Sequence, residues 1–175
     1  MTPGRRFSVM LALAVGLGLA GCSGADPGQP LADGSNSAFH HEVTTAASPA
    51  SVWDLWMDVD GWKDWDKGLA DAAADSPLAL GTAGTITALN GQVSGFVVTE
   101  FIAERAYAFA TDLPLATLTV ERRITGEAPT RFRHDVTFTG PMGWAWAMLL
   151  GAEFRAALPP TMATLANLAA QGEVE

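Results

Sequence analysis

Cysteine and basic residues are scarce in this sequence of 175 residues. It contains one cysteine, and ten lysines and arginines stand against 19 aspartates and glutamates. A single cysteine cannot form a disulfide within the chain, so stability has to come from the burial of side chains. The formal net charge of −9 argues against nucleic acid as a partner, because phosphate binding depends on clustered Lys and Arg.

The motifs of several common enzyme classes are also missing. We find no Ser-His-Asp order, phosphate-binding loop, nucleotide fingerprint or paired-carboxylate arrangement, although distant residues can form such sites in space. The three histidines have no carboxylate partners at ligand spacing, and His40 and His41 would lie on opposite faces of a strand. We therefore expect no metal site and no cofactor.

The N-terminal region has the pattern of a secretory signal peptide. Arg5 and Arg6 precede an apolar run over residues 10–20, and small residues then lead to Cys22. An uncleaved membrane anchor is the alternative, but a bilayer span needs roughly 20 apolar residues. The last four residues of this region, Leu-Ala-Gly-Cys at 19–22, resemble a bacterial lipobox.

The resemblance to a lipobox implies cleavage before Cys22 and acylation of its thiol. Residues 1–21 are then a lipoprotein signal peptide, and residues 22–37 are the lipidated cysteine followed by a flexible linker rich in Gly, Ser, Asp, Ala and Pro. Loss of the two arginines lowers the formal charge from −9 to −11. We expect a cell-envelope protein whose lipid holds it on the extracytoplasmic face of a bacterial membrane.

Residues 38–172 have the pattern of one α+β domain. Alternation predicts a first strand over residues 38–45, and Ser48-Pro49 predicts the start of a helix. Further strands are predicted over residues 82–89, 95–103, 106–111, 117–125 and 131–139, and a long helix over 142–171. Such a helix can bury its apolar side only by lying across an antiparallel sheet.

Four segments of this domain resemble one known superfamily. They are residues 48–53 (Ser-Pro-Ala-Ser-Val-Trp), 61–66 (Gly-Trp-Lys-Asp-Trp-Asp), 137–141 (Thr-Phe-Thr-Gly-Pro), and the Leu158-Pro159 and 165–169 ending of the helix. Their order and spacing are similar to the START-like, polyketide cyclase/dehydrase (SRPBCC) superfamily. The resemblance implies the helix-grip fold, in which a curved antiparallel sheet wraps a long C-terminal helix around an apolar cavity.

His134, Arg122 and Tyr107 are the candidate catalytic residues. Alternation places His134 on one strand face with Phe132, Val136 and Phe138, which predicts a polar group facing the cavity. A core histidine bonded to a neighbour is the alternative. Arg122 and Arg123 point to opposite faces, and the sequence does not decide which of them faces inward.

The candidate ligand contacts are mostly aromatic. Indole rings combine a large apolar surface with one hydrogen-bond donor, although core packing is the more usual role of such residues. Trp144 and Trp146 lie about 200° apart on a helical wheel, so one can face a cavity and the other a membrane. The candidates are Trp56, Trp65, Phe96, Phe109, Phe132, His134, Phe138 and Trp146.

Three functions remain open from the sequence. The first is a lipid-anchored monomer that binds an apolar small molecule or lipid in its cavity. The second is an enzyme of the cyclase or hydratase type acting on a hydrophobic substrate through His134, Arg122 or Tyr107. The third is an interaction scaffold with a filled core and no ligand.

Overall fold

The computed structural model describes residues 36–172 of the chain. The expected signal peptide, the lipidated Cys22 and almost all of the linker lie outside these residues. Within them no helix is long and apolar enough to cross a membrane. The candidate domain predicted over residues 38–172 lies entirely inside the described part.

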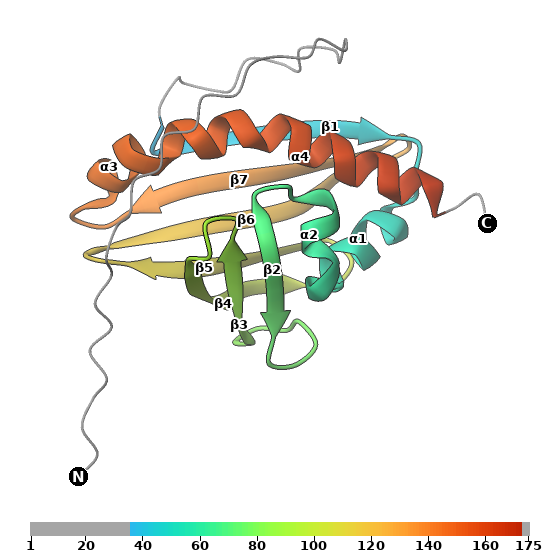
Figure 1. Cartoon of the computed structure of the whole chain (residues 1–175). Coiled ribbons are helices and arrows are strands. Elements are labelled where there is room, and N and C mark those ends of the chain that lie inside the picture. The colour runs from blue at the N-terminus through green and yellow to red at the C-terminus, as the bar shows by residue number, and fades with distance from the viewer. Residues whose placement is uncertain (1–35, 173–175) are drawn as a thin grey trace.

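A single curved sheet and one long helix make up most of the domain (Figure 1). The seven strands follow the order β1-β7-β6-β5-β4-β3-β2, and all neighbours are antiparallel. The strands are β1 (Ala38–Thr45), β2 (Leu69–Ala74), β3 (Ala83–Ala88), β4 (Val93–Ile102), β5 (Ala106–Leu113), β6 (Ala116–Glu127) and β7 (Thr130–Thr139). The helical segments are α1 (Pro49–Met57), η1 (Val59–Gly61), α2 (Trp62–Trp65), α3 (Gly143–Trp146), the π-helical turn η2 (Ala147–Gly151) and α4 (Ala152–Gln171). The predicted helix-grip α+β fold is confirmed.

Helix α4 lies across the sheet through a regular apolar stripe. Its buried residues recur at helical spacing and are Leu158, Met162, Leu165, Ala166 and Ala169. The Thr45 hydroxyl, at the end of β1, donates a hydrogen bond to the Ala166 carbonyl at 3.2 Å. Both Pro159 and Pro160 lie inside α4, which continues through them to Gln171.

Strand β2 was not predicted, because its sequence Leu-Ala-Asp-Ala-Ala-Ala contains poor strand formers. Tertiary packing stabilises it instead. Ala72 is buried in the core, and β2 pairs with β3 along most of its length. Gly84 of β3 permits a close approach, since a Cβ there would lie 2.4 Å from both the Ala73 carbonyl oxygen and the Phe96 ring.

The start of α1 matches the prediction. The Ser48 hydroxyl accepts a hydrogen bond from the Ser51 amide at 3.2 Å, and Pro49 occupies the first helical position. This capped helix buries Val52, Trp53 and Trp56 against the inner face of the sheet.

We expect Met162→Ala to lower the free energy of unfolding by about 2–5 kcal/mol, because Met162 is 0% exposed at the centre of the α4 stripe. Met148→Ala is the matched control, since Met148 is 74% exposed and its truncation should change stability by no more than about 0.5 kcal/mol. Urea denaturation of the two variants measures the difference. Equal effects would contradict this assignment of the core.

Candidate functional site

A row of polar side chains crosses the inner face of the sheet. In the strand register Tyr107 of β5 pairs with Arg122 of β6, and Arg122 pairs with His134 of β7. His134 in turn pairs with His41 of β1. All four residues are buried, so the antiparallel register brings together four polar groups that are far apart in the sequence.

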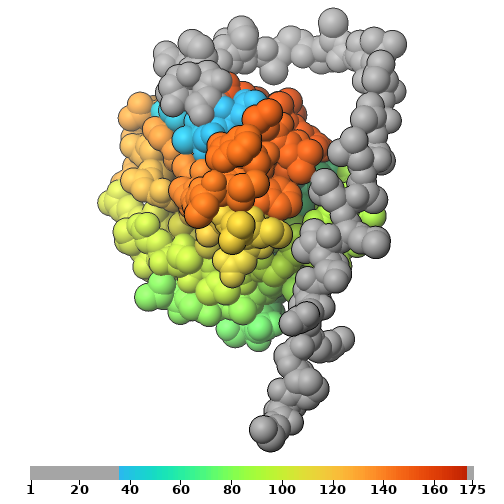
Figure 2. Space-filling view, turned by 90° about the vertical axis from the view of Figure 1, so that its left-hand side faces the viewer, coloured from blue at the N-terminus to red at the C-terminus, as the bar shows by residue number. Residues whose placement is uncertain are grey.

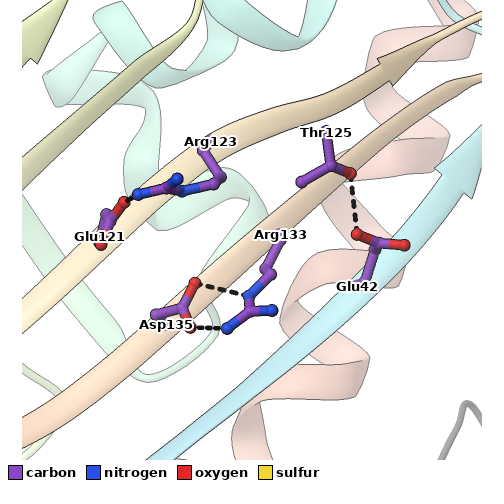
Figure 3. Close-up of polar contacts among 6 residues, drawn as sticks. All are labelled: Glu42, Glu121, Arg123, Thr125, Arg133 and Asp135. Atoms are coloured by element: carbon purple, nitrogen blue, oxygen red, sulfur yellow. Dashed lines mark hydrogen bonds and ion pairs between the residues drawn. The ribbon is translucent and has the colours of Figure 1, made fainter.

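The outer face of the same strands carries charged side chains of both signs that pair with one another (Figure 3). Arg123 forms an ion pair with Glu121, Arg133 pairs with Asp135, and the Thr125 hydroxyl donates to Glu42 at 2.8 Å. The structure thereby resolves the choice that the sequence left open. Arg122 faces the interior and Arg123 faces outward.

Arg122 is a buried cation surrounded by aromatic rings. The side chain is 4% exposed, and its guanidinium carbon lies 4.4 Å from the centre of the Trp62 ring and 4.7 Å from that of Trp65. One Nη group donates a hydrogen bond to the Tyr107 hydroxyl. Among the described residues no carboxylate forms an ion pair with Arg122. Contacts with ring faces compensate only part of the cost of burying this charge.

Four buried nitrogen atoms in this region have no hydrogen-bond partner among the described residues. They are Trp56 Nε1, Trp65 Nε1, Arg122 Nε and His134 Nε2. The His134 ring centre lies 5.6 Å from that of Trp56 and 6.2 Å from that of Trp65, and Arg122 lies against the Trp65 ring, so all four atoms belong to one group of contacting side chains. Each unpaired buried polar group costs about 1–3 kcal/mol, so this cluster is a candidate place for a polar group of a ligand to bind.

Burial and the Arg122 charge set the protonation of the neighbouring groups. Burial lowers the pKa of His134 well below its usual value, and the charges of Arg122 and His41 lower it further. Burial raises the pKa of Tyr107 to about 12, although Arg122 opposes this shift. At neutral pH the row therefore presents a neutral imidazole and a protonated phenol beside a cation.

Asp66 is an acidic group whose pKa is affected by the Arg122 charge. Burial raises the pKa of the Asp66 carboxyl, while a hydrogen bond from the Gly68 amide and the Arg122 charge act in the opposite direction. Its carboxylate is not within ion-pair distance of the guanidinium. Arg122 thus keeps hydrogen-bonding capacity that no acidic side chain occupies.

Aromatic rings fill the space where the family resemblance implies a cavity. Trp62 stacks on Phe96 and Phe109, with ring centres 5.7 and 5.5 Å apart, and Trp56 contacts Phe132 at 6.0 Å. The two best-formed hollows lie elsewhere, at the surface. One of about 190 Å³ lies between η1 and the β2–β3 connection, and one of about 340 Å³ lies beside α3. Neither hollow is lined by a residue of this ring network.

Six of the eight predicted ligand contacts surround the polar row, and two do not. Trp56, Trp65, Phe96, Phe109, Phe132 and His134 form one network of ring contacts with Tyr107 and Trp62. Phe138 instead packs on Phe154 near the end of β7, with ring centres 6.2 Å apart. Trp146 is half-buried beside the hollow at α3, where its Nε1 donates to the Pro114 carbonyl.

Sequence reasoning missed Trp62 and Asp66 as parts of the site. Trp62 supplies the ring nearest to the Arg122 guanidinium, and its Nε1 donates to the Trp56 carbonyl at 2.9 Å. Both residues lie in the segment 61–66 that carried part of the family resemblance. The orientation of α2 relative to α1 determines which indole ring contacts the Arg122 guanidinium. The spacing of residues in the sequence does not predict this orientation. Among residues 36–172 no three His, Cys, Asp or Glu side chains lie close enough to hold a metal ion.

Comparison with family models identifies the family to which the chain belongs. The model described as polyketide cyclase/dehydrase and lipid transport matches residues 37–172. The chain belongs to this family. No curated protein matches the sequence. The predicted superfamily is confirmed for the domain.

Solved structures of similar fold share little sequence with this family member. Protein NE0264 from Nitrosomonas europaea is 17% identical with a TM-score of 0.60, over 80% of this chain and 98% of that one. Norcoclaurine synthase from Thalictrum flavum, in complex with dopamine and hydroxybenzaldehyde, is 14% identical with a TM-score of 0.53, over 77% and 86%. The di-domain ARO/CYC StfQ from the steffimycin biosynthetic pathway is 13% identical with a TM-score of 0.60, over 79% and 52%.

We expect the stability of the domain to fall as pH drops through about 6.5, where an unfolded histidine takes up a proton that buried His134 does not. The unfolded state then binds more protons, which gives a slope of up to about 1.4 kcal/mol per pH unit for one group. Replacing His134 by Gln should remove this contribution in urea titrations between pH 7.5 and 5.5.

The comparison of slopes, rather than of absolute stabilities, isolates His134. The pKa of His41 is also lowered and adds a slope of the same sign, whereas the raised pKa of Asp66 acts in the opposite direction. Both contributions are present in the wild type and in the variant. Identical slopes in the two proteins would show that His134 does not stay neutral in the folded state.

Proposed function

We propose that this chain is a lipid-anchored envelope protein whose domain binds an apolar molecule carrying one anionic or strongly hydrogen-bond-accepting group. The buried Arg122 carries this proposal. Its guanidinium has an unpaired Nε, no ion-pair partner among the described residues, and two indole rings against it. An oxyanion or carboxylate of a ligand would complete its hydrogen bonds.

Energetics favour a functional reason for Arg122 over a structural one. A buried charge without a counter-ion costs several kcal/mol, and apolar residues of similar volume often serve stability as well or better. The surrounding rings suit an apolar body attached to the acceptor group. Because the rings fill the interior, binding has to displace some of them, and the family description of lipid transport fits such a ligand.

The N-terminal motif supports the membrane-anchored part of the proposal. Cys22 is the only cysteine and follows small residues and an apolar run, as in a lipobox. One acyl chain gives marginal binding to a bilayer, and two or more hold a protein there stably. The domain would then work at the extracytoplasmic face of a bacterial membrane, as a carrier or reservoir of its ligand.

One observation favours a second function, a cyclase-type reaction. Tyr107, Arg122 and His134 are adjacent across three strands, and His134 is neutral at pH 7. The free Nε2 of a neutral imidazole can accept a hydrogen bond, a phenol can donate one, and a guanidinium can stabilise an enolate. StfQ, which shares the fold, is named as a di-domain ARO/CYC, and norcoclaurine synthase, which also shares it, is named as a synthase.

Arg122→Met should abolish the preference of the protein for an acid over its ester while leaving the domain folded. The probes are a long-chain fatty acid and its methyl ester, which differ in charge and not in apolar length. A charge-assisted hydrogen bond of about 1.5–3 kcal/mol predicts a preference of roughly 10- to 150-fold in the wild type. Competition binding with the full chain in detergent measures this ratio.

Arg123→Met is the matched control, because Arg123 lies one position further on the outer face and should leave the ratio unchanged. Retention of the preference in Arg122→Met would refute the role of this residue. Failure of the wild type to bind either probe would favour the scaffold. Recovery of a probe with altered mass would favour the enzyme over the carrier.

Cys22→Ser should leave the protein unacylated with its signal region attached. Intact mass spectrometry of the chain extracted from bacterial membranes measures this directly. The wild type should begin at Cys22 and carry the added mass of acyl groups. A wild-type chain that still contains residues 1–21, or that begins at Cys22 without added mass, would refute the lipoprotein assignment.

A further inference from the structure

One end of the domain exposes a continuous group of large apolar side chains. The apolar end face consists of Leu115, Met142, Trp144, Met148 and Leu149, and three of these are more than 60% exposed. The Met142 amide donates to the Leu115 carbonyl at 3.0 Å, and both residues line the hollow of about 340 Å³ with Leu149. In Figure 2 helix α3 and η2, in orange, lie directly above the yellow start of β6.

This end face is free of charge in an otherwise acidic protein. Residues 136–152 and 113–120 contain no Asp, Glu, Lys, Arg or His, although the whole chain has a formal charge of −9. Apolar surface in water costs about 25 cal/mol per Å², and compact groups of such residues mark interaction sites. Leu115 also keeps a positive φ of 57° while 72% exposed, at a turn position that glycine adopts more easily.

The beginning of the described chain lies against the same end. A Cβ on Gly151 of η2 would lie 2.4 Å from the Asn36 carbonyl oxygen, so the two backbones touch. The Ser37 carbonyl accepts a hydrogen bond from the Phe138 amide at 2.8 Å, at the end of β7 next to α3. The described chain therefore begins beside the apolar end face.

The length of the segment between Cys22 and Asn36 limits how the domain can face a membrane. Cys22 precedes Asn36 by 14 positions, and a flexible chain of that length spans roughly 20 Å on average. A domain of this size has a radius of gyration of about 14 Å, and hence a diameter near 35–40 Å. A lipid on Cys22 therefore keeps the apolar end face closer to the bilayer than the opposite end.

We propose that the apolar end face docks on the lipid surface to which the chain is anchored, with Trp144 and Met148 entering the region between headgroups and acyl chains. This orientation rests on the proposed acylation of Cys22. Tryptophan suits this depth because its ring is apolar and its N–H remains hydrated. The absence of basic residues from the face favours zwitterionic over anionic lipid, since the acidic domain is repelled by anionic headgroups.

Quenching by brominated lipid tests the proposal. The full chain is purified in detergent and reconstituted into phosphatidylcholine vesicles that carry bromine on their acyl chains. Trp144 is 62% exposed, whereas the other five tryptophans are buried or half-buried, so quenching reports mainly on this residue. We expect quenching in the wild type, its loss in Trp144→Phe, and at least a twofold reduction in Met148→Glu.

Leu80→Glu is the matched control. Leu80 is 69% exposed, but it lies in the connection between β2 and β3, which Figure 1 draws at the bottom of the molecule, far from α3. This variant should be quenched like the wild type. Equal quenching of Met148→Glu and Leu80→Glu, or of Trp144→Phe and the wild type, would overturn the proposal.

Quenching and sedimentation together distinguish docking of the apolar end face from anchoring through an acylated Cys22. An acylated chain that sediments with vesicles but shows no Trp144 quenching would refute docking and keep the anchor. An unacylated chain whose Trp144 is still quenched would refute the anchor and keep the docking face. A dimer in vesicle-free solution that Met148→Glu dissociates would show that the face binds a second copy, which also overturns docking on lipid.

Discussion

The cation–aromatic contact between Arg122 and the indole rings of Trp62 and Trp65 is the constraint on which the interior depends. A guanidinium carries a permanent charge, so its neighbours have to be polarisable surfaces or hydrogen-bond acceptors. Helix α2 supplies both rings, and β5 supplies the Tyr107 hydroxyl. Burial and the Arg122 charge together lower the pKa of His134, whereas burial raises the pKa of Asp66 against the effect of that charge.

The register of the strands determines which polar side chains lie next to one another on the inner face of the sheet. Each antiparallel pairing puts residues of one face opposite each other, and four consecutive pairings align Phe101, Tyr107, Arg122, His134 and His41 across the sheet. A shift by one residue would exchange Arg122 for Arg123 and expose the row to solvent. The ion pairs of the outer face, which Figure 3 shows on β6 and β7, each join two residues of the same strand that lie two positions apart.

Local patterns predicted a large part of this fold. The alternation in β7 and the Ser48-Pro49 helix start involve neighbours in the sequence, and both were predicted correctly. Strand β2 was missed because its alanines gain their stability from neighbouring elements. For the candidate site, the alternation of residues correctly predicted the strand face on which His134 lies. The inward direction of Arg122 and the stacking of Trp62 were not, because they depend on which sheet face the helices cover.

The pairing of β1 with β7 has a consequence for how the chain acquires its structure. The first strand has no neighbour in the sheet except the last one, and the end of β1 is bonded to α4 through Thr45 and Ala166. Contacts of such sequence separation form slowly, because a long loop has to close before they are gained. The domain therefore stays incomplete until β7 and α4 have been synthesised.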